Sequence, residues 1–151
     1  MSVKEQIDAD LKTAMLAGEK TLVTTLRGLK SAILYAEVAE NKRDEGLAED
    51  SVITLLQKEA KKRQESADLF KQGGNLEKQA AELVEKTVIE KYLPAQLSEE
   101  EITKMVEETI AATGAQGMQS MGQVIGAVKD KAGPAADGSV IARIVKEKLS
   151  Q

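Results

Sequence analysis

The side chains that most enzymes use for acid–base chemistry, nucleophilic attack or metal binding are scarce in this sequence. The chain contains no histidine and no cysteine, which excludes the commonest general base, thiolate nucleophiles, disulfides and thiolate metal sites. Carboxylates cluster at Glu99-Glu100-Glu101. That cluster could do acid–base or metal chemistry, but carboxylates in the first turn of a helix also favour the positive end of the helix dipole.

Nucleotide-binding loops are also missing. Neither G-x-x-x-x-G-K-[ST] nor a strand-borne G-x-G-x-x-G occurs, and the remaining Ser, Lys and Tyr residues show no triad-like spacing. We therefore expect no catalytic residue, no cofactor and no metal. Catalysis by this chain alone would have to proceed without a histidine, a cysteine or a nucleotide-binding loop.

A basic segment, Lys58 to Ser66, is a candidate phosphate-contacting ridge. Lys58, Lys61, Lys62 and Glu65 recur at helical spacing and share one side of a helix. Arg63 falls on or beside the apolar stripe of the same helix, from which its guanidinium can reach outward. The alternative is a solvated face partnered by Glu59 and Glu65, with Arg63 in an Arg–Glu pair between helices.

A second candidate is the segment Met121-Gly122-Gln123-Val124-Ile125-Gly126. Gly122 and Gly126 lie four residues apart on one helical face, and each costs a helix about 1 kcal/mol relative to Ala. Either close helix packing or the close approach of a ligand backbone, such as an RNA phosphate or ribose, could offset that cost. Cations that could accompany such a ligand follow in the sequence at Lys129, Lys131, Arg143 and Lys146.

The overall composition limits which partners fit. With 30% charged residues and a net charge of −4, the 151-residue chain is globular, and nucleic acid could bind only at a local basic patch. Its three aromatic residues are too few for base stacking along a single strand. No long apolar run or signal-peptide core occurs, so we expect a cytoplasmic protein without a membrane partner.

Apolar residues recur at helical spacing from the N-terminus to about residue 92, and no segment alternates with period two. Four helices are expected there: one ended by Gly18, a longer second one, a third capped by Asp50 or Ser51, and a fourth capped by Asn75. The inward stripe of the fourth is expected at Leu76, Ala80, Leu83 and Thr87, with Val84 and Val88 beside them.

An elbow follows the fourth helix. Pro94 should end that helix near Tyr92, and Ser98 with Glu101 forms a capping box that starts the next one. Three shorter helices are expected after it, with ends near Gly114 and Gly133-Pro134 and a cap at Asp137. The predicted fold is all-α, with an N-terminal bundle of about four helices over residues 1–93 and a C-terminal three-helix unit over residues 94–151.

Several stretches together resemble the YqeY family, the free-standing form of the GatB/YqeY domain. In chain order they are Leu26-Arg27-Gly28-Leu29-Lys30-Ser31-Ala32-Ile33, Lys62-Arg63-Gln64-Glu65-Ser66, Tyr92-Leu93-Pro94-Ala95-Gln96-Leu97-Ser98-Glu99-Glu100-Glu101-Ile102, Met121-Gly122-Gln123-Val124-Ile125-Gly126 and Ala136-Asp137-Gly138-Ser139-Val140. The resemblance implies a two-part helical fold and kinship with the C-terminal tail of the B subunit of glutamine-dependent Asp/Glu-tRNA amidotransferase. In that carbon–nitrogen ligase, with glutamine as amido donor, the tail helps to hold tRNA while other domains do the chemistry. The family's glycine helix commonly reads Met-Gly-Lys-Val-Met-Gly, so Gln123 and Ile125 depart from it.

Two hypotheses follow. The first is a non-catalytic tRNA-binding or tRNA-enzyme accessory protein that recognises RNA shape through backbone contacts. Its expected RNA-binding residues are Lys58, Lys62, Arg63, Gly122, Gly126, Lys129, Lys131, Arg143 and Lys146. The second is a protein–protein adaptor whose C-terminal unit docks on an aminoacyl-tRNA synthetase or amidotransferase without contacting RNA.

Overall fold

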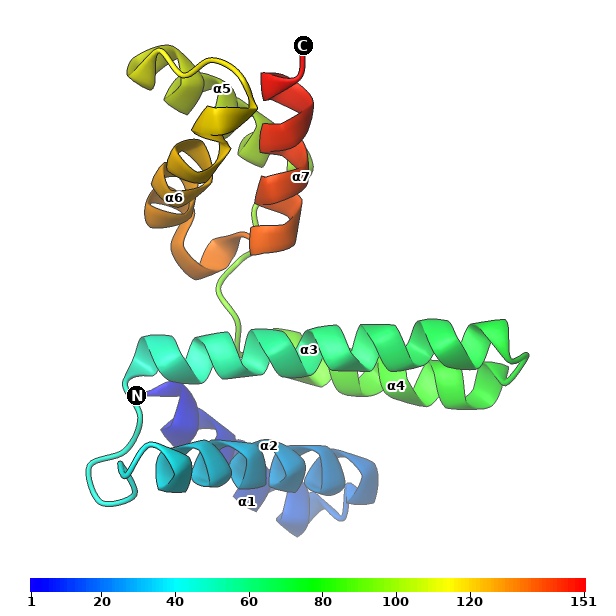
Figure 1. Cartoon of the computed structure of the whole chain (residues 1–151). Coiled ribbons are helices and arrows are strands. Elements are labelled where there is room, and N and C mark those ends of the chain that lie inside the picture. The colour runs from blue at the N-terminus through cyan, green and yellow to red at the C-terminus, as the bar shows by residue number, and fades with distance from the viewer. The chain divides into compact units, whose positions relative to one another are not determined.

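The computed structural model describes residues 1–151 and contains seven α-helices, two short 3₁₀ helices and no strand, which confirms the all-α prediction. In chain order the elements are α1 (Val3–Ala17), α2 (Lys20–Ala39), α3 (Glu49–Gln72), α4 (Leu76–Glu90), α5 (Glu99–Thr113), η1 (Met118–Ser120), α6 (Met121–Ala132), η2 (Gly133–Ala135) and α7 (Gly138–Leu149) (Figure 1). The chain divides into two compact units, unit 1 (Met1–Leu93) and unit 2 (Pro94–Gln151).

Unit 1 consists of two helical hairpins, α1–α2 and α3–α4, packed around one apolar core. Gly18 ends α1 in the left-handed conformation with φ of 72°, where a Cβ would be strained. The core takes residues from all four helices: Val3, Ile7, Leu11, Ala14, Leu26, Leu29, Ile33, Val52, Leu56, Ala60 and Ile89. On α3 these residues end at Ala60, so the rest of that 24-residue helix lies beyond the core cluster.

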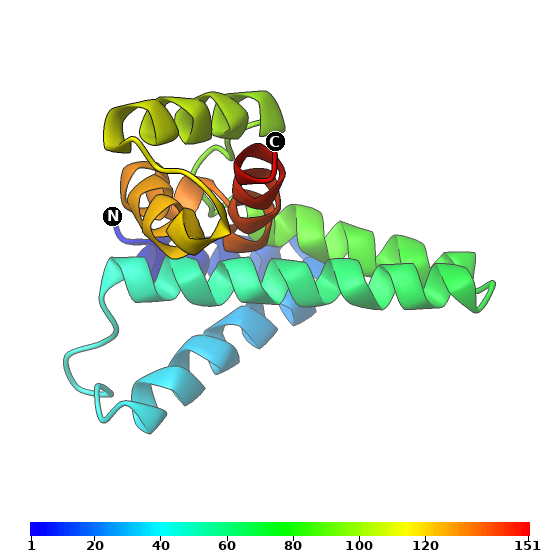
Figure 2. The ribbon, with the colours of Figure 1, turned by 45° about the horizontal axis from the view of Figure 1, so that its top comes forward.

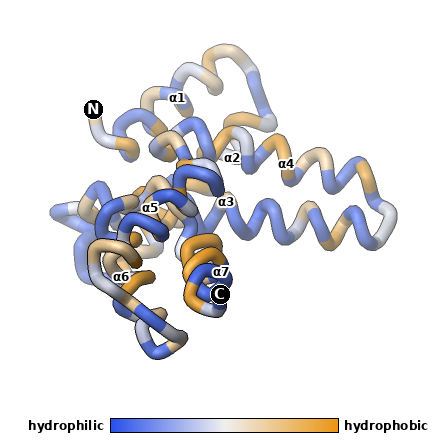
Figure 3. The backbone as a smooth tube through the Cα atoms, turned by 90° about the horizontal axis from the view of Figure 1, so that it is seen from above, coloured by the Kyte–Doolittle hydropathy of each residue, from blue (hydrophilic) through white to orange (hydrophobic).

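The distal part of the α3–α4 hairpin therefore extends past α1 and α2 (Figures 1 and 2). Figure 3 shows hydrophilic residues along most of α3. The predicted inward stripe of α4 is wrong here, because Leu76 and Val84 are exposed by 66% and 53%, and Ala80 and Thr87 are exposed too. Beyond the core cluster α4 instead brings Glu82, Glu85 and Lys86 toward α3, although Ala67 of α3 is still fully buried there and Leu83 of α4 is half-buried.

The start of α3 also differs from the prediction. Neither Asp50 nor Ser51 caps the helix, which begins at Glu49 after Ala48 without a side-chain cap. Glu49 has a longer-range role, since its Oε1 accepts a hydrogen bond of 3.0 Å from the backbone N–H of Val3. That contact ties the first turn of α3 to the first turn of α1.

The elbow has the caps that the sequence predicts. Helix α4 ends at Glu90, two residues before Tyr92. At the start of α5, Ser98 Oγ accepts from the Glu101 N–H at 3.1 Å, and Glu101 Oε2 accepts from the Ser98 N–H at 2.9 Å. Tyr92 and Leu93 pack against the core of unit 1.

Unit 2 packs α5, α6 and α7 around eight buried apolar residues: Ile102, Val106, Val124, Val128, Ile141, Ile144, Val145 and Leu149. Its helix ends follow the predicted signals. Gly114 ends α5 with φ of 67°, and Asp137 caps α7 by accepting from the Ser139 N–H at 2.9 Å. The chain before α5 is tied to η2, because the Leu97 N–H donates to the Ala135 carbonyl oxygen at 2.8 Å.

Candidate functional site

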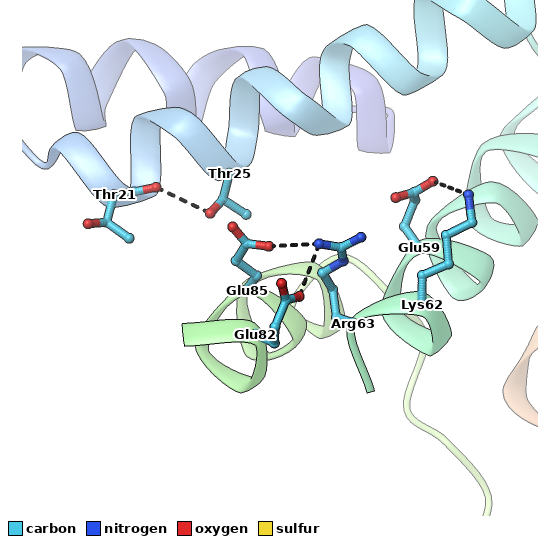
Figure 4. Close-up of polar contacts among 7 residues, drawn as sticks. All are labelled: Thr21, Thr25, Glu59, Lys62, Arg63, Glu82 and Glu85. Atoms are coloured by element: carbon cyan, nitrogen blue, oxygen red, sulfur yellow. Dashed lines mark hydrogen bonds and ion pairs between the residues drawn. The ribbon is translucent and has the colours of Figure 1, made fainter. Parts of the chain in front are cut away.

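The cations in the basic segment of α3 have two different surroundings. Lys58 and Lys62 are exposed; Lys62 lies 3.4 Å from the carboxylate of Glu59, one turn away. Arg63 instead points across the hairpin, where its Nη1 lies 3.0 Å from Glu82 and 3.4 Å from Glu85 on α4 (Figure 4). Arg63 therefore makes the interhelical Arg–Glu contact that the sequence left open as an alternative.

The same polar interface continues one residue further along α3. The side-chain oxygen of Gln64 accepts a hydrogen bond of 2.8 Å from Lys86 on α4. Polar and charged contacts thus join α3 to α4 where the apolar core has ended. They explain why the inward face of α4 could not be read from its apolar residues.

The glycine face of α6, made of Gly122 and Gly126, is open. Both residues are exposed, and a Cβ added at either would meet no heavy atom within 4 Å. Close helix packing, one of the two explanations for these glycines, does not occur at either position. The buried Val124 and Val128 lie on the other side of the helix.

Lys129 shares the glycine face and Lys131 does not. At roughly 100° per residue, Lys129 lies within about 20° of Gly122 around the helix axis, whereas Lys131 lies about 180° away. Lys129 also reaches the start of α7, since a Cβ on Gly138 would come within 2.9 Å of its Cε and 3.2 Å of its Nζ. Gly138 therefore leaves room for the Lys129 side chain across the first turn of α7.

The two expected cations of α7 differ in their partners. Arg143 contacts the carboxylates of Glu99 on α5 and Glu147 on α7. Lys146 is exposed and makes no ion pair. Arg143 is therefore partly neutralised by acidic residues of unit 2, and Lys146 is not.

The carboxylate cluster at the start of α5 has structural partners for two of its three members. Glu101 completes the capping box, and Glu99 pairs with Arg143. Glu100 is exposed. No group of three or more potential metal-ligating side chains is arranged to hold a metal ion.

Sequence reasoning missed Glu37, which is 1% exposed and the one buried carboxylate of the chain. Its oxygens accept from the Lys4 ammonium at 2.9 and 3.0 Å, and Oε2 also accepts from the Leu47 N–H at 3.2 Å. Gly46, with φ of 80°, passes so close that an added Cβ would lie 3.2 Å from Oε2. The sequence did hold one sign that Glu37 is buried: it lies four residues after Ile33, on the apolar stripe of α2.

A family model described as Yqey-like protein matches residues 4–149, which span both units. The chain belongs to the YqeY family. No match to a curated protein was found. No α-helix of this YqeY-family chain combines the length and hydrophobicity needed to cross a lipid bilayer.

Two residues of α6 depart from the sequence that is common in the YqeY glycine helix. The departures at Gln123 and Ile125 have different surroundings: Gln123 is exposed, whereas Ile125 is half-buried and packs against the core of unit 2. Of these two positions, Gln123 lies fully on the surface and Ile125 lies partly in the core.

Proposed function

We propose that this YqeY-family chain is a non-catalytic tRNA-binding or tRNA-enzyme accessory protein, with the glycine face of α6 as its main RNA contact. The observation that carries the proposal is that Gly122 and Gly126 are exposed with nothing packed on them. Their cost to the helix, about 1 kcal/mol each, is not offset by contacts within the chain. A ligand that needs close access to the helix backbone supplies the missing reason.

A sugar–phosphate backbone fits this face in shape and charge. Without side chains at Gly122 and Gly126, a ribose or phosphate can approach the helix surface directly, as backbone-directed RNA recognition requires. Lys129, on the same face, supplies a cation at the end of the helix. From residue 129 to residue 151 the sequence holds five basic and three acidic residues, a local net charge of +2 in an acidic protein.

Lys131 and Lys146 extend the basic character of unit 2 without lying on the glycine face, and Lys58 and Lys62 present a second basic surface on unit 1. Arg63 supports that second surface indirectly, because its contacts with Glu82 and Glu85 hold α3 against α4. Arg143 is likewise engaged with Glu99 and Glu147. Within the proposal, the lysines contact phosphate and the two arginines maintain the helices that present them.

The test is fluorescence anisotropy of a labelled tRNA titrated with wild-type protein and with Gly126→Glu over a salt series. A Cβ at this position meets no heavy atom within 4 Å, and glutamate has a higher helix propensity than glycine, so the fold should be kept or stabilised. It places a carboxylate where the proposal places a phosphate. Binding should weaken by at least about ten-fold, and the wild-type log–log salt slope should reflect about 0.7–0.9 per phosphate contact.

Gly126→Ala is the matched control, because it adds the same Cβ without the charge. It should weaken binding less than Gly126→Glu does, because its Cβ only blocks the closest approach of the RNA backbone, and it should raise helix stability. Equal affinity for wild type and Gly126→Glu would place the RNA elsewhere, and no binding at low salt would remove the RNA function itself. Lys146→Glu, away from the glycine face, then reports how much the wider basic surface contributes.

An adaptor function is the second candidate. The sequence placed its docking surface on the C-terminal unit, but the structural feature that favours it lies in unit 1, on the distal α3–α4 hairpin. There Leu69 and Leu76 are each exposed by 66% and Val84 by 53%. Where exposed apolar side chains form a contiguous patch, they mark a protein-binding surface. Ribonuclease-treated protein should then co-migrate with a purified tRNA amidotransferase or synthetase, and Leu76→Glu should abolish the complex while Gly126→Glu leaves it intact.

A further inference from the structure

A cleft of about 540 Å³ lies between α1 and α2, within unit 1. Its volume falls in the range typical of small-molecule sites in proteins, about 300–1,000 Å³. The lining includes Arg27, Lys30 and Ser31, the polar residues of the stretch from Leu26 to Ile33 that carries part of the family resemblance. None of these three residues has a role in the proposed RNA contact.

The cleft is lined by more cations than carboxylates. Three cations line it, Lys4, Arg27 and Lys30, against two carboxylates, Asp8 and Glu37. Lys4 pairs with Glu37 at 2.9 Å, and Lys30 pairs with Asp8 at 2.7 Å. Arg27 has no carboxylate partner, and its guanidinium makes one weak contact of 4.0 Å with the sulfur of Met15. One positive charge of the cleft therefore lacks a counter-ion within the chain.

The residues around that charge suit an anion with two or more oxygens. Arg27 and Ser31 are four residues apart on α2 and so share one face, with Lys30 beside them. The planar guanidinium matches the geometry of carboxylate and phosphate groups. Ser31 is exposed and its hydroxyl has no hydrogen-bond partner, so it is free to donate to the same anion.

The rest of the lining is apolar. Leu11 and Ile33 contribute from the core, exposed by 8% and 1%, and Leu34 stands at the edge with 47% exposure. An anion alone would leave the exposed part of Leu34 in water. A ligand with a charged head and a short hydrocarbon body would cover Leu34, and removing that apolar surface from water favours binding.

We infer that the α1–α2 cleft binds a small amphiphilic anion. Its carboxylate or phosphate head lies on Arg27 and Ser31, and its hydrocarbon body lies against Leu11 and Leu34. The inference is independent of the proposed tRNA contact, which lies on α6 in unit 2.

The test is a titration of the full, isotope-labelled chain by NMR with hexanoate and with hexyl phosphate, and with hexanol as the neutral analogue. At least one of the two anions should shift amide resonances of α1 and α2 saturably, and the tighter one identifies the head group. Hexanol should bind at least about ten-fold more weakly, because it lacks the charge-assisted contact with the Arg27 guanidinium. Inorganic phosphate alone should shift the Arg27 region weakly, since it leaves the apolar wall uncovered.

Arg27→Gln should weaken anion binding by about ten-fold, and Ser31→Ala by a smaller factor of about two to five. Arg43→Gln is the matched control: Arg43 is exposed, makes no ion pair and does not line the cleft. It should bind like wild type. Circular dichroism checks that each variant is folded.

Three results would overturn the inference. If neither anion saturates the amide shifts at millimolar concentration, the cleft is not a ligand site. Equal binding of hexanol and the anions would reduce it to an apolar depression. Equal losses for Arg27→Gln and Arg43→Gln would show that the anions respond to net charge alone.

Discussion

The polar groups inside the two units differ in kind. Both units bury a threonine whose hydroxyl donates to a carbonyl oxygen of its own helix, Thr25 to Thr21 at 3.2 Å in unit 1 and Thr109 to Met105 at 2.8 Å in unit 2, but only unit 1 also buries a carboxylate, that of Glu37. Glu37 joins Lys4 on α1 to the loop before α3, so its contacts span three segments of chain. The core of unit 2 is held by apolar packing, with ion pairs only among more exposed side chains.

This difference bears on where function can lie. Charged residues of unit 1 such as Glu37 and Arg63 are engaged in contacts between helices, so a cation there is not automatically available to a ligand. In unit 2, α6 turns Gly122 and Gly126 away from the core, where an added Cβ would meet no heavy atom within 4 Å. The comparison predicts that substituting the engaged charges Glu37 and Arg63 of unit 1 will mainly affect stability, and that substitutions at Gly122 and Gly126 will mainly affect binding.

The largest expected effect is that of Glu37→Ala. The change leaves the Leu47 N–H and the Lys4 ammonium without their acceptor. Losing a buried, charge-assisted contact typically costs about 2–3 kcal/mol where one partner stays half exposed, as Lys4 does. Urea denaturation followed by circular dichroism should show that loss of unfolding free energy.

Glu40→Ala is the matched control for this prediction, since Glu40 lies three residues further on, is exposed and makes no ion pair. Its unfolding free energy should stay within about 0.5 kcal/mol of wild type. A loss for Glu37→Ala no larger than that of Glu40→Ala would contradict the contrast between the two units.

The next effect is that of Arg63→Ala, expected to cost about 1–2 kcal/mol because Glu82 and Glu85 would be left near each other without their shared cation. Lys62→Ala, at an exposed site on the same helix, should cost less than about 0.5 kcal/mol. The two variants separate the roles within one motif: Lys62→Ala should weaken tRNA binding without unfolding the hairpin. Equal stability of the two variants would show that the Arg63 contacts contribute nothing.

How much of the structure can be predicted from the sequence depends on how far apart along the chain the interacting residues lie. Caps and stops are local, so Ser98, Gly114 and Asp137 could be placed from neighbouring residues alone. The partner of Arg63 lies 19 or 22 residues away on another helix, and that of Glu37 lies 33 residues away. Periodicity carries no information about such pairs.

The error in α4 has a tertiary origin. An apolar stripe predicts the buried face only where a core remains to receive it, and the distal hairpin lies beyond that core. For the candidate site, the glycine spacing on α6 was visible in the sequence. That nothing packs on those glycines is a tertiary property, which required the positions of α5 and α7.

A smaller effect of opposite sign is expected for Gly126→Ala. The added methyl group meets no neighbour, and alanine is favoured over glycine in a helix by about 1 kcal/mol. Unfolding free energy should therefore rise. Gly46→Ala is the informative contrast, because φ of 80° and the nearby Glu37 Oε2 should make the same change destabilising in unit 1. A stability loss for Gly126→Ala would reveal packing on α6 and remove the basis of the proposed RNA contact.

The smallest effect is a dependence of unit 1 on alkaline pH through Tyr92, whose hydroxyl donates to Asp10 on α1. Burial raises the pKa of Tyr92 above its usual value near 10, and the Asp10 carboxylate raises it further. Because the folded-state pKa is the higher one, this contribution to stability is fully present below about pH 10 and is lost as the pH rises toward the folded-state pKa. The difference in unfolding free energy between wild type and Tyr92→Phe should thus be constant from pH 7 to about pH 9 and decrease above about pH 10. Urea titrations of both proteins at each pH measure it, with Tyr35→Phe, at an exposed ring, as the control for losing one phenol. A difference that stayed constant above about pH 10 would mean that Asp10 does not hold the protonated phenol in place, and that the elbow side of unit 1 rests on the apolar contacts of Tyr92 and Leu93 alone.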